Sequence, residues 1–405
     1  MKKPLIVLLA GGVGNNFFPL ATDKTLFPIM GKLMVEHVLD VLSATGIEEV
    51  VAATNPQNDS VIKRHPLVKR TALLEKPTGM HAGILAVKDY ITDQSIVVVN
   101  AVDLIEKEGL SSFFAAISNQ YAMILGKKVN AHQAGGYLEM CDGKVKSIVE
   151  KPEKGKEPSD IVNLIVHYFS QPKKFISLLE GAGDVDDAYE QAFSQIMQNH
   201  DVALHTYEGA WSKLKYPFHV LDVMGQLLSG VERSIAPTAH VSEHAVIEGA
   251  VVIADNAIVD EFAVVKGPAY IGNGARVGNH ALVRQSVVEK AAIVGFGSEV
   301  VRSYVGPGCM LHHNYVGDSV LEKNVNPSWG TTTANYRLDK KHVMLKLPDG
   351  KTIDTQREKF GCIMAEGVFC GVNCSIMPGV TIKKNAQIYP GKVIPNVVKE
   401  DEVVK

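Results

Sequence analysis

A polar set near the C-terminus has the composition of an acid–base site. It combines imidazole, phenol, amide and ammonium groups in the order His312, Tyr315, Asn326, Asn335 and Lys359, and a second histidine, His313, follows the first directly. Histidine is the side chain that takes up and releases a proton near neutral pH. Taken alone, a histidine here also fits a surface or packing role, so these residues leave both a general base and a structural role open.

A second stretch with chemical potential lies near the N-terminus, where glycines follow an apolar run. The motif Gly11-Gly12-x-Gly14 comes directly after residues 5–10. Glycines allow a tight turn in which backbone N–H groups wrap closely around a phosphate. Taken alone, the same pattern also fits an ordinary turn between a strand and a helix, so the motif leaves both interpretations open.

Alternating strands and helices must position this glycine motif. The hydrophobic pattern predicts strands at residues 5–10, 50–53 and 96–99, with helices at residues 32–45 and 83–90. Such alternation indicates a parallel sheet that binds ligands at the carboxyl ends of its strands. Turn-rich residues predict an antiparallel insertion over residues 134–150, and helical patterns return at residues 172–180, 187–199 and 219–229.

A strict six-residue repeat must position the C-terminal set. Branched residues recur at Ile235, Val241, Ile247, Ile253, Val259, Val265, Ile271, Val277 and Val283, and a small residue follows each of them by four positions. This is the hexapeptide signature of a parallel β-helix. Each branched residue should face inward and stack about 4.8 Å from its counterpart in the next coil. An amphipathic helix would need apolar spacings of three and four.

The repeat is less regular beyond Val283. It resumes through Ile293, Val305 and Leu311, and the charged residues 337–358 predict a loop or hairpin excursion from the coil. A spacing of six returns at Cys370, Ile376, Ile382, Ile388 and Ile394. The predicted fold class is therefore α/β with a Rossmann-like domain over residues 1–230 and a left-handed parallel β-helix over residues 231–405.

Length and composition agree with a globular chain of two domains. The 405 residues exceed what one core usually holds, and the composition of 46% hydrophobic and 21% charged residues is ordinary. The net charge of −3, with 41 basic residues spread along the chain, predicts no nucleic-acid partner. Five cysteines without metal-type spacing predict reduced thiols rather than a disulfide framework.

The first residues only faintly imitate a signal peptide. The apolar run over residues 5–10 stops at Gly11-Gly12, which is short for the apolar core of a signal peptide. No apolar run approaches the roughly 20 residues that cross a bilayer. We therefore expect a cytoplasmic protein without a membrane partner.

The N-terminal stretch resembles the start of the sugar-1-phosphate nucleotidylyltransferases. The resemblance rests on Gly11-Gly12-Val13-Gly14 and Asp23-Lys24, followed in the family's order by Gly79-Met80, Asn100-x-x-Asp103, Gly135-Gly136-Tyr137, Glu150-Lys151-Pro152, Asn163, Tyr189-Glu190, Trp211 and Pro217. It implies that a sugar 1-phosphate attacks the α-phosphate of a nucleoside triphosphate (NTP) and releases pyrophosphate. It also implies the roles of the residues: Gly11, Gly12, Gly14 and Gly79 bind the nucleotide, Lys24 neutralises phosphate charge, Asp103 holds Mg²⁺, and Gly136, Glu150 and Asn163 contact the sugar.

The C-terminal stretch is similar to the acetyltransferase half of a bifunctional family. Its members join an N-acetylglucosamine-1-phosphate uridylyltransferase to a glucosamine-1-phosphate acetyltransferase and include archaeal-type relatives. The shared order His-x-x-Tyr-x-Gly-Asp, Asn-x-Asn and Thr-x-x-Asn extends the resemblance over nearly the whole chain. It implies attack of an amine on acetyl-CoA with His312 as base, and His313 as the rival. Tyr315, Asn326, Asn335 and Lys359 would bind the sugar and orient the acetyl group, Arg302 would contact a sugar phosphate, and the chain would form a homotrimer with CoA between neighbouring β-helices.

Several positions depart from the family pattern. Asn15 and Asn16 replace a small hydroxyl residue and an arginine, Leu74 or Glu75 stands where a glutamine reads the base, and Lys213 replaces a carboxylate. Trp329 stands in Pro327-Ser328-Trp329-Gly330, where relatives have a run of small residues. Three hypotheses follow: a bifunctional enzyme, an acetyltransferase with a degenerate N-terminal domain, or a non-enzymatic scaffold subunit. The intact C-terminal polar set favours an enzyme over a scaffold.

Overall fold

The computed structural model describes residues 3–75, 78–133, 135–183, 185, 187–347 and 349–405. The chain divides into two compact units. The first contains Met1–Val13 and Met34–Trp211, and the second contains Gly14–Leu33 and Ser212–Lys405. The second unit thus includes a short segment from near the N-terminus. The predicted domain boundary at residue 230 stays a sequence-based prediction.

The first unit is built on a mixed sheet in the order β10-β9-β11-β6-β1-β4-β5. Its parallel part consists of β1 (Leu5–Leu9), β4 (Val50–Thr54), β5 (Val68–Leu73) and β6 (Ile96–Asn100). Its antiparallel part adds β11 (Ile161–Phe169), the hairpin β9 (Gly136–Cys141) and β10 (Lys144–Glu150), and β8 (Ala122–Lys128) beside β12 (Val202–Tyr207). The predicted strands and the antiparallel insertion are confirmed.

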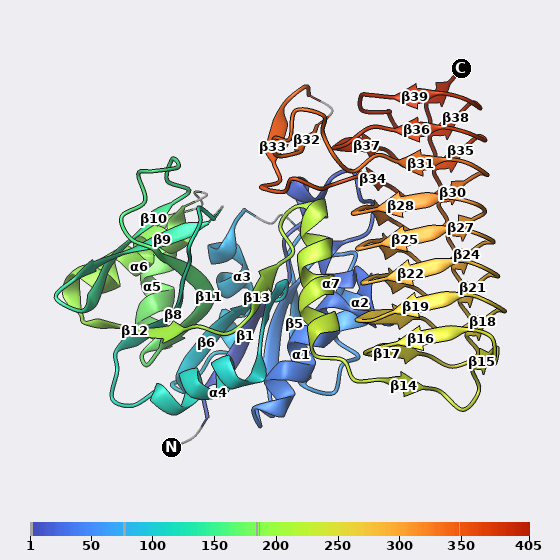
Figure 1. The fold of residues 1–405 in the computed structure, drawn as a ribbon. Coiled ribbons are helices and arrows are strands. Elements are labelled where there is room, and N and C mark those ends of the chain that lie inside the picture. The colour runs from blue at the N-terminus through green and yellow to red at the C-terminus, as the bar shows by residue number, and fades with distance from the viewer. Residues whose placement is uncertain (1–2, 76–77, 134, 184, 186, 348) are drawn as a thin grey trace. The chain divides into compact units, whose positions relative to one another are not determined.

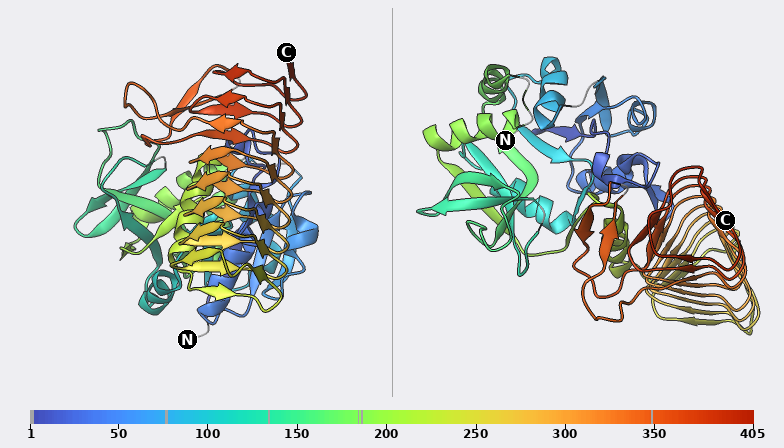
Figure 2. Two further views of the ribbon diagram at one scale, coloured as in Figure 1. Left: turned by 45° about the vertical axis from the view of Figure 1, so that its right-hand side comes forward. Right: turned by 90° about the horizontal axis from the view of Figure 1, so that it is seen from above.

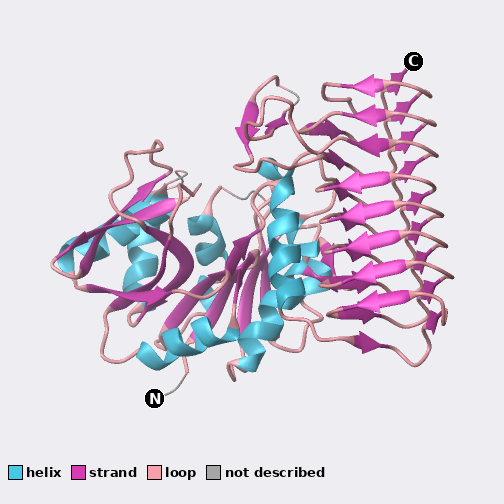
Figure 3. Cartoon of the chain, in the orientation of Figure 1, coloured by secondary structure: helices cyan, strands magenta, loops and turns pink. Residues whose placement is uncertain are grey.

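Helices flank this sheet (Figure 3). They are α1 (Met34–Ala44), α2 (Asp59–Ile62), α3 (Met80–Ala86), α4 (Lys107–Ala116), α5 (Pro172–Ala182) and α6 (Ala188–Asn199). The predicted helix over residues 83–90 begins and ends earlier, and a short 3₁₀ turn (Lys88–Tyr90) follows it. Leu5 and Val7 pack on the side of α3, α5 and α6, while the alternating Ile6 and Leu8 are also fully buried. Both faces of the sheet are therefore covered, as the continuous apolar strand predicts.

The second unit is a parallel β-helix whose coils stack along one axis (Figure 1). Three rows of short parallel strands form its faces (Figure 2). The first face contains β14 (Ser234–Ile235), β17 (Val251–Ile253), β20 (Ala269–Ile271), β23 (Val287–Val288), β26 (Tyr304–Val305), β29 (Val320–Leu321), β34 (Cys362–Met364) and β37 (Val380–Ile382). The second face contains β15 (His240–Val241), β18 (Ile258–Val259), β21 (Arg276–Val277), β24 (Ile293–Val294), β27 (Met310–Leu311), β30 (Asn326–Pro327), β35 (Phe369–Cys370), β38 (Gln387–Ile388) and β40 (Val403–Val404). The third face contains β16 (Val246–Glu248), β19 (Val264–Lys266), β22 (Leu282–Arg284), β25 (Glu299–Val301), β28 (Tyr315–Gly317), β31 (Thr332–Thr333), β36 (Ser375–Ile376) and β39 (Val393–Ile394).

The six-residue repeat forms the core of these coils. From Ile253 to Val283 every predicted inward residue is at most 1% exposed. Ile235 is 41% exposed, because it lies in the first coil and has no preceding coil to cover it. Beyond Val283 one correction applies: Val294, not Ile293, is the buried residue of its strand. The spacing slips by one residue at the turn before Val288, which then carries the inward register.

The predicted excursion from the coil is a hairpin. Strands β32 (Met344–Lys346) and β33 (Thr352–Asp354) pair antiparallel, and the Thr381 hydroxyl on the β-helix donates to the Lys346 carbonyl at 2.9 Å. The predicted helix over residues 219–229 is α7 (Val220–Ser229). Within the described ranges, no helix is both long and apolar enough to cross a membrane.

Candidate functional site

The glycine motif follows the central strand β1 of the first unit. The Ala10 carbonyl accepts a hydrogen bond from Asn58 Nδ2 at 2.8 Å, which fixes the chain as it enters the turn. A Cβ on Gly11 would stand 2.5 Å from Leu74 Cδ1, whereas a Cβ on Gly12 would meet no atom within 4 Å. An alanine at position 11 would therefore force the Leu74 side chain to move. The same contact shows that Leu74 presents a buried alkyl group, and Leu74 is one of two candidates, with Glu75, for the position where the resemblance expects a glutamine.

Asp103 lies at the same edge of this sheet. Strand β6 pairs with β1 in parallel and places Asn100 beside Leu9 at their carboxyl ends. Asn100 Nδ2 donates to Asp103 Oδ1 at 3.3 Å, and Asp103 is only 8% exposed. A single buried carboxylate beside an amide oxygen suits Mg²⁺, which uses one or two carboxylates and takes further oxygens from phosphates and water.

Gly79, a predicted nucleotide-binding residue, lies directly before α3 in the first unit. Its φ of 118° and ψ of −175° are open only to glycine, and it caps α3, which contacts β1 and β4. Helix α3 approaches closely because Gly83 has no side chain: a Cβ there would stand 2.8 Å from Leu9 Cδ2. The structure thus places Gly79 on a helix packed against the strand that leads to Gly11.

The three predicted sugar contacts lie on the antiparallel part of the sheet. Gly136 and Glu150 face each other across the β9–β10 hairpin, and a Cβ on Gly136 would collide with the Glu150 carboxylate. Asn163 Oδ1 lies 2.8 Å from His167 Nε2, and His167 Nδ1 lies 2.6 Å from the Tyr189 hydroxyl. Burial lowers the pKa of His167 to about 3, so this imidazole is neutral and orients Asn163. His167 was not predicted from the sequence, because a histidine inside a strand gives no signal of its own.

Gly14 and Lys24 belong to the second unit. Gly14 has a φ of 71°, and a Cβ on it would stand 3.2 Å from Lys24 Cε, so glycine lets the lysine side chain pass. The pKa of His219 is lowered to about 3, mainly by burial. Nearby positive charges, among them Lys213 and Lys24, lower this pKa further. Lys213 and Lys24 therefore both place positive charge near His219.

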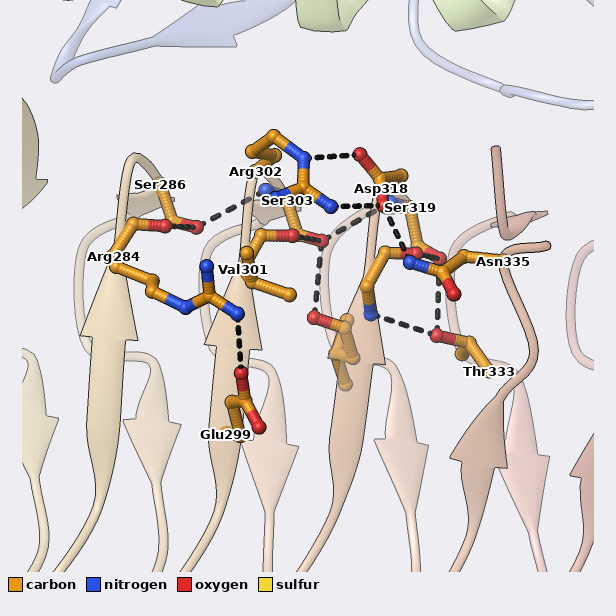
Figure 4. A network of polar contacts seen from close by, with 12 residues as sticks. Arg284, Ser286, Glu299, Val301, Arg302, Ser303, Asp318, Ser319, Thr333 and Asn335 are labelled. Carbon is orange, nitrogen blue, oxygen red and sulfur yellow. Dashed lines mark hydrogen bonds and ion pairs between the residues drawn. The ribbon is translucent and has the colours of Figure 1, made fainter. Parts of the chain in front are cut away.

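Asp318 is the centre of a polar cluster on the β-helix (Figure 4). Its carboxylate accepts from Arg302 Nε at 2.6 Å and Arg302 Nη2 at 2.7 Å, and from Asn335 Nδ2 at 2.5 Å. Asn335 Nδ2 also lies 3.1 Å from the Tyr315 hydroxyl. The bond to Asp318 raises the pKa of Arg302. Two predicted residues, Arg302 and Asn335, thus bond to one carboxylate, and Tyr315 joins the cluster through Asn335. Asp318 itself stands in the Gly-Asp of the quoted motif, although no role was predicted for it.

Small residues make room for this cluster at the corner between the third and first faces. A Cβ on Gly317 would stand 2.7 Å from both Asn335 Nδ2 and the Tyr315 hydroxyl. Beneath it, buried serines form a ladder: the Ser303 and Ser319 N–H groups donate to the hydroxyls of Ser286 and Ser303 at 3.0 and 3.1 Å (Figure 4). The ladder satisfies buried polar groups and fixes the backbone under Asp318.

The two adjacent histidines have different surroundings. His313 stacks between Phe296 and Trp329, with ring centroids 6.2 and 5.3 Å away, and its Nδ1 lies 3.0 Å from the Phe296 carbonyl. His312 is exposed, and its backbone N–H donates to the buried Asn314 Oδ1 at 2.7 Å. His313 is thus held in an aromatic column, whereas the imidazole of His312 faces solvent.

The remaining predicted residues are divided between faces of the β-helix. The backbone of the exposed Lys359 forms an isolated antiparallel β-bridge with that of Tyr336. The N–H of the next residue, Phe360, donates to the Asn335 carbonyl at 2.9 Å. Asn326 lies on the second face, away from Tyr315 on the third. Its buried Oδ1 has no hydrogen-bond partner among the described residues. One chain therefore gathers Tyr315, Asn335 and Lys359 but separates Asn326 from them.

Comparisons with known proteins bear on both halves. The family described as Nucleotidyl transferase matches residues 5–214, and the Bacterial transferase hexapeptide (six repeats) family matches residues 250–285, consistent with a left-handed β-helix. The "Bifunctional sugar-1-phosphate nucleotidylyltransferase/acetyltransferase" of Sulfurisphaera tokodaii is 29% identical over 98% of this chain and 99% of its own. The "Bifunctional protein GlmU" of Methanocaldococcus jannaschii is 30% identical over 98% of this chain and 98% of its own.

Proposed function

The chain belongs to the family of bifunctional sugar-1-phosphate nucleotidylyltransferase/acetyltransferases, and from this premise we propose that it catalyses both reactions. One transfers a nucleotidyl group from an NTP to a sugar 1-phosphate, giving a nucleotide sugar and pyrophosphate. The other transfers the acetyl group of acetyl-CoA to an amino-sugar phosphate. The observation that carries the proposal is the cluster around Asp318, which joins Arg302, Asn335 and Tyr315.

For nucleotidyl transfer, the chain supplies positioning and charge neutralisation rather than a covalent nucleophile. Gly11, Gly12, Gly14 and Gly79 would bind the triphosphate through backbone N–H groups, and Lys24 would neutralise charge that develops on it. Mg²⁺, held by Asp103, would supply a Lewis acid for the phosphate oxygens. Gly136, Glu150 and Asn163 would contact the sugar, with Asn163 oriented by the neutral His167.

For acetyl transfer, His312 would take the proton that the attacking ammonium group must lose. Its exposure leaves the imidazole accessible to substrate, whereas the stacking of His313 suits a structural role. Tyr315, Asn335 and Lys359 would bind the amino sugar, and Arg302 would face its phosphate with part of its charge balanced by Asp318. The attacking amine then forms the new amide bond while the thioester C–S bond breaks and CoA leaves.

Assembly into a homotrimer would account for Asn326. This residue lies on a different face from Tyr315 and has a buried Oδ1 without a partner among the described residues. We propose that neighbouring β-helices meet so that Asn326 of one chain and His312 of another contribute to one acetyl-CoA site. Within this proposal the enzyme is cytoplasmic and acts on small molecules without nucleic-acid or membrane partners.

Two assays on one purified preparation test the function. Sugar 1-phosphates are presented with each NTP and Mg²⁺ while pyrophosphate is measured, and amino-sugar phosphates such as glucosamine 1-phosphate are presented with acetyl-CoA while CoA is measured. We expect both products. Absence of pyrophosphate with every NTP would leave an acetyltransferase alone, and absence of both products would favour a non-enzymatic subunit.

A further inference from the structure

The segment of residues 14–33 belongs to the nucleotidyl transferase region by sequence but to the β-helix unit by structure. Residues 14–33 lie inside the region matched by the Nucleotidyl transferase family. In the structure, however, Gly14–Leu33 belongs to the same compact unit as the β-helix. This segment contains Lys24, and the contacts that hold it in place come from the β-helix.

The first attachment point is Glu322, at the corner that follows β29. Its Oε1 accepts from the Thr22 N–H at 2.9 Å and the Thr22 hydroxyl at 2.6 Å, and its Oε2 accepts from the Ala21 N–H at 3.1 Å. The N–H of Glu366, on the β-helix, donates to Oε2 at 2.9 Å as well. Glu322 is only 2% exposed. The backbone two residues before Lys24 is thus fixed by a buried carboxylate about 300 residues later in the chain.

The second attachment point lies two coils earlier, at the corner that follows β23, where Glu289 holds the tip of a hairpin. Strands β2 (Pro28–Ile29) and β3 (Lys32–Leu33) form this hairpin, whose turn is Met30-Gly31. The Met30 and Gly31 N–H groups donate to the Glu289 carboxylate at 2.5 and 3.2 Å. Glu289 is 1% exposed.

A tyrosine completes the attachment between the two carboxylates. The Tyr304 hydroxyl donates to the Pro28 carbonyl at 2.7 Å, and its ring lies 5.1 Å from that of Phe27. Phe27 in turn packs edge-to-face on Phe17 at 5.5 Å. Lys24 therefore lies in a stretch of backbone fixed on both sides, at Thr22 by Glu322 and at Phe27 and Pro28 by Tyr304.

These contacts are an expensive way to attach a loop if attachment alone is required. Burying a carboxylate costs several kcal/mol before its hydrogen bonds offset the loss of water, and apolar contacts would attach the loop at lower cost. Charged hydrogen bonds, however, fix direction and register. An error of about 1 Å in the position of a catalytic group can lower a rate by about 100-fold.

We propose that Glu322 and Glu289 are positioning residues for nucleotidyl transfer: these carboxylates of the β-helix fix the backbone that carries Lys24. The inference rests on the proposed role of Lys24 in that reaction. The β-helix would then fix the backbone around Lys24 in addition to carrying the acetyltransferase residues. Removal of the Glu322 charge should displace Lys24 without changing the acetyl site, because Glu322 lies at another corner of the β-helix from Asp318.

The test uses the full chain and the variants Glu322→Gln and Thr22→Val. Glu248→Gln is the control, because Glu248 is an exposed carboxylate of the β-helix that pairs with Lys266 on the third face. Hydrogen–deuterium exchange of peptides that contain Ala21 and Thr22 reports the attachment, and it does not depend on activity. Pyrophosphate release and CoA release are measured on the same preparations.

We expect Glu322→Gln to speed exchange at Ala21 and Thr22 and to lower kcat for nucleotidyl transfer about tenfold, with CoA release within about twofold of wild type. Thr22→Val should have a smaller effect, and the two changes together should be less than additive, because they remove the same contact. If Glu322→Gln folds poorly, Thr22→Val still tests the contact, because it changes the residue of the segment and leaves Glu322 intact.

The two ways in which this account can fail are distinguishable. Unchanged exchange at Ala21 and Thr22 in Glu322→Gln would overturn the attachment. Faster exchange with an unchanged kcat would overturn the positioning role, as would an equal loss of both activities, which indicates general destabilisation. A wild-type chain that releases no pyrophosphate would instead refute the proposed nucleotidyl function, and with it any positioning role in that reaction.

Discussion

The guanidinium of Arg302 forms two parallel hydrogen bonds with the carboxylate of Asp318, at 2.6 and 2.7 Å. The two residues lie in successive coils of the β-helix, at the same corner, and both have a positive φ. Because Asn335 shares the same carboxylate, this ion pair determines where the phosphate-facing and sugar-facing side chains of the proposed acetyl site stand.

Replacement of Asp318 by asparagine should therefore impair acetyl transfer, although Asp318 acts through Arg302 and Asn335 and not by direct contact with substrate. The amide would lose one of two acceptor oxygens and release Arg302 and Asn335 from their positions, so we expect kcat/KM for CoA release to fall about 10- to 100-fold. Asp260→Asn is the control, since Asp260 forms the same type of pair with Arg276 at 2.7 and 3.2 Å elsewhere on the β-helix. Equal activity losses in both variants would contradict the role of Asp318.

The two adjacent histidines should respond differently to substitution. His312→Gln removes the proposed base and should lower kcat for acetyl transfer by about 10²- to 10⁴-fold. His313→Phe keeps a ring between Phe296 and Trp329 and should retain most of the activity. Steady-state CoA release measures both. The reverse pattern would show that His313 is the base.

The glycine motif can be tested by adding one methyl group at two neighbouring positions. Gly11→Ala places its Cβ against Leu74 Cδ1, whereas Gly12→Ala meets no atom within 4 Å. We expect Gly11→Ala to lower the rate of nucleotidyl transfer. We also expect it to lower the melting temperature more than Gly12→Ala does. Gly11→Ala/Leu74→Ala should recover part of the stability, because the second change removes the clash. No recovery would show that Leu74 is not the obstacle.

The pH dependence of stability should reveal Glu289. Burial raises the pKa of Glu289 to about 7 from the usual 4.5 of a glutamate, against the opposing effect of the Met30, Gly31 and Lys290 N–H groups. Between these values the folded chain keeps a proton that the unfolded chain has lost, so the free energy of unfolding falls as the pH rises. Glu289→Gln removes this contribution to the pH dependence of the free energy of unfolding, because glutamine does not titrate.

Urea unfolding of wild type and Glu289→Gln at about pH 5 and about pH 8 measures the effect. The stability of wild type relative to the variant should decrease by on the order of 2–3 kcal/mol over this range. A difference that is the same at both pH values would show that Glu289 does not titrate in this window.

The sequence predicted the elements of both units but not all of their details. Period-six spacing identifies the inward residues because the coil repeats physically. It could not show that Ile235 would be exposed at an open end, or that the register would slip at the turn before Val288, since both depend on the neighbouring coil. At the candidate site, motif order predicted Tyr315 and Asn335 but assigned no role to Asp318.

The attachment of residues 14–33 to the β-helix could not be predicted. Glu289 and Glu322 occur among many charged residues of a repetitive sequence, and nothing in their spacing shows that N–H groups from the distant segment will bury them. Asn163 gave a signal through the family motif, but its partner His167 gave none. Local pattern therefore predicts elements, while contacts between distant segments require the structure.

The central claim is that one chain carries two separate catalytic sites, and a crossed comparison of two variants tests it most directly. Pyrophosphate release and CoA release are measured for wild type, Lys24→Ala and His312→Ala, with folding checked by melting temperature. We predict that Lys24→Ala loses pyrophosphate release and keeps CoA release, and that His312→Ala does the opposite. Loss of both activities in either variant, or unchanged CoA release in His312→Ala, would contradict the account.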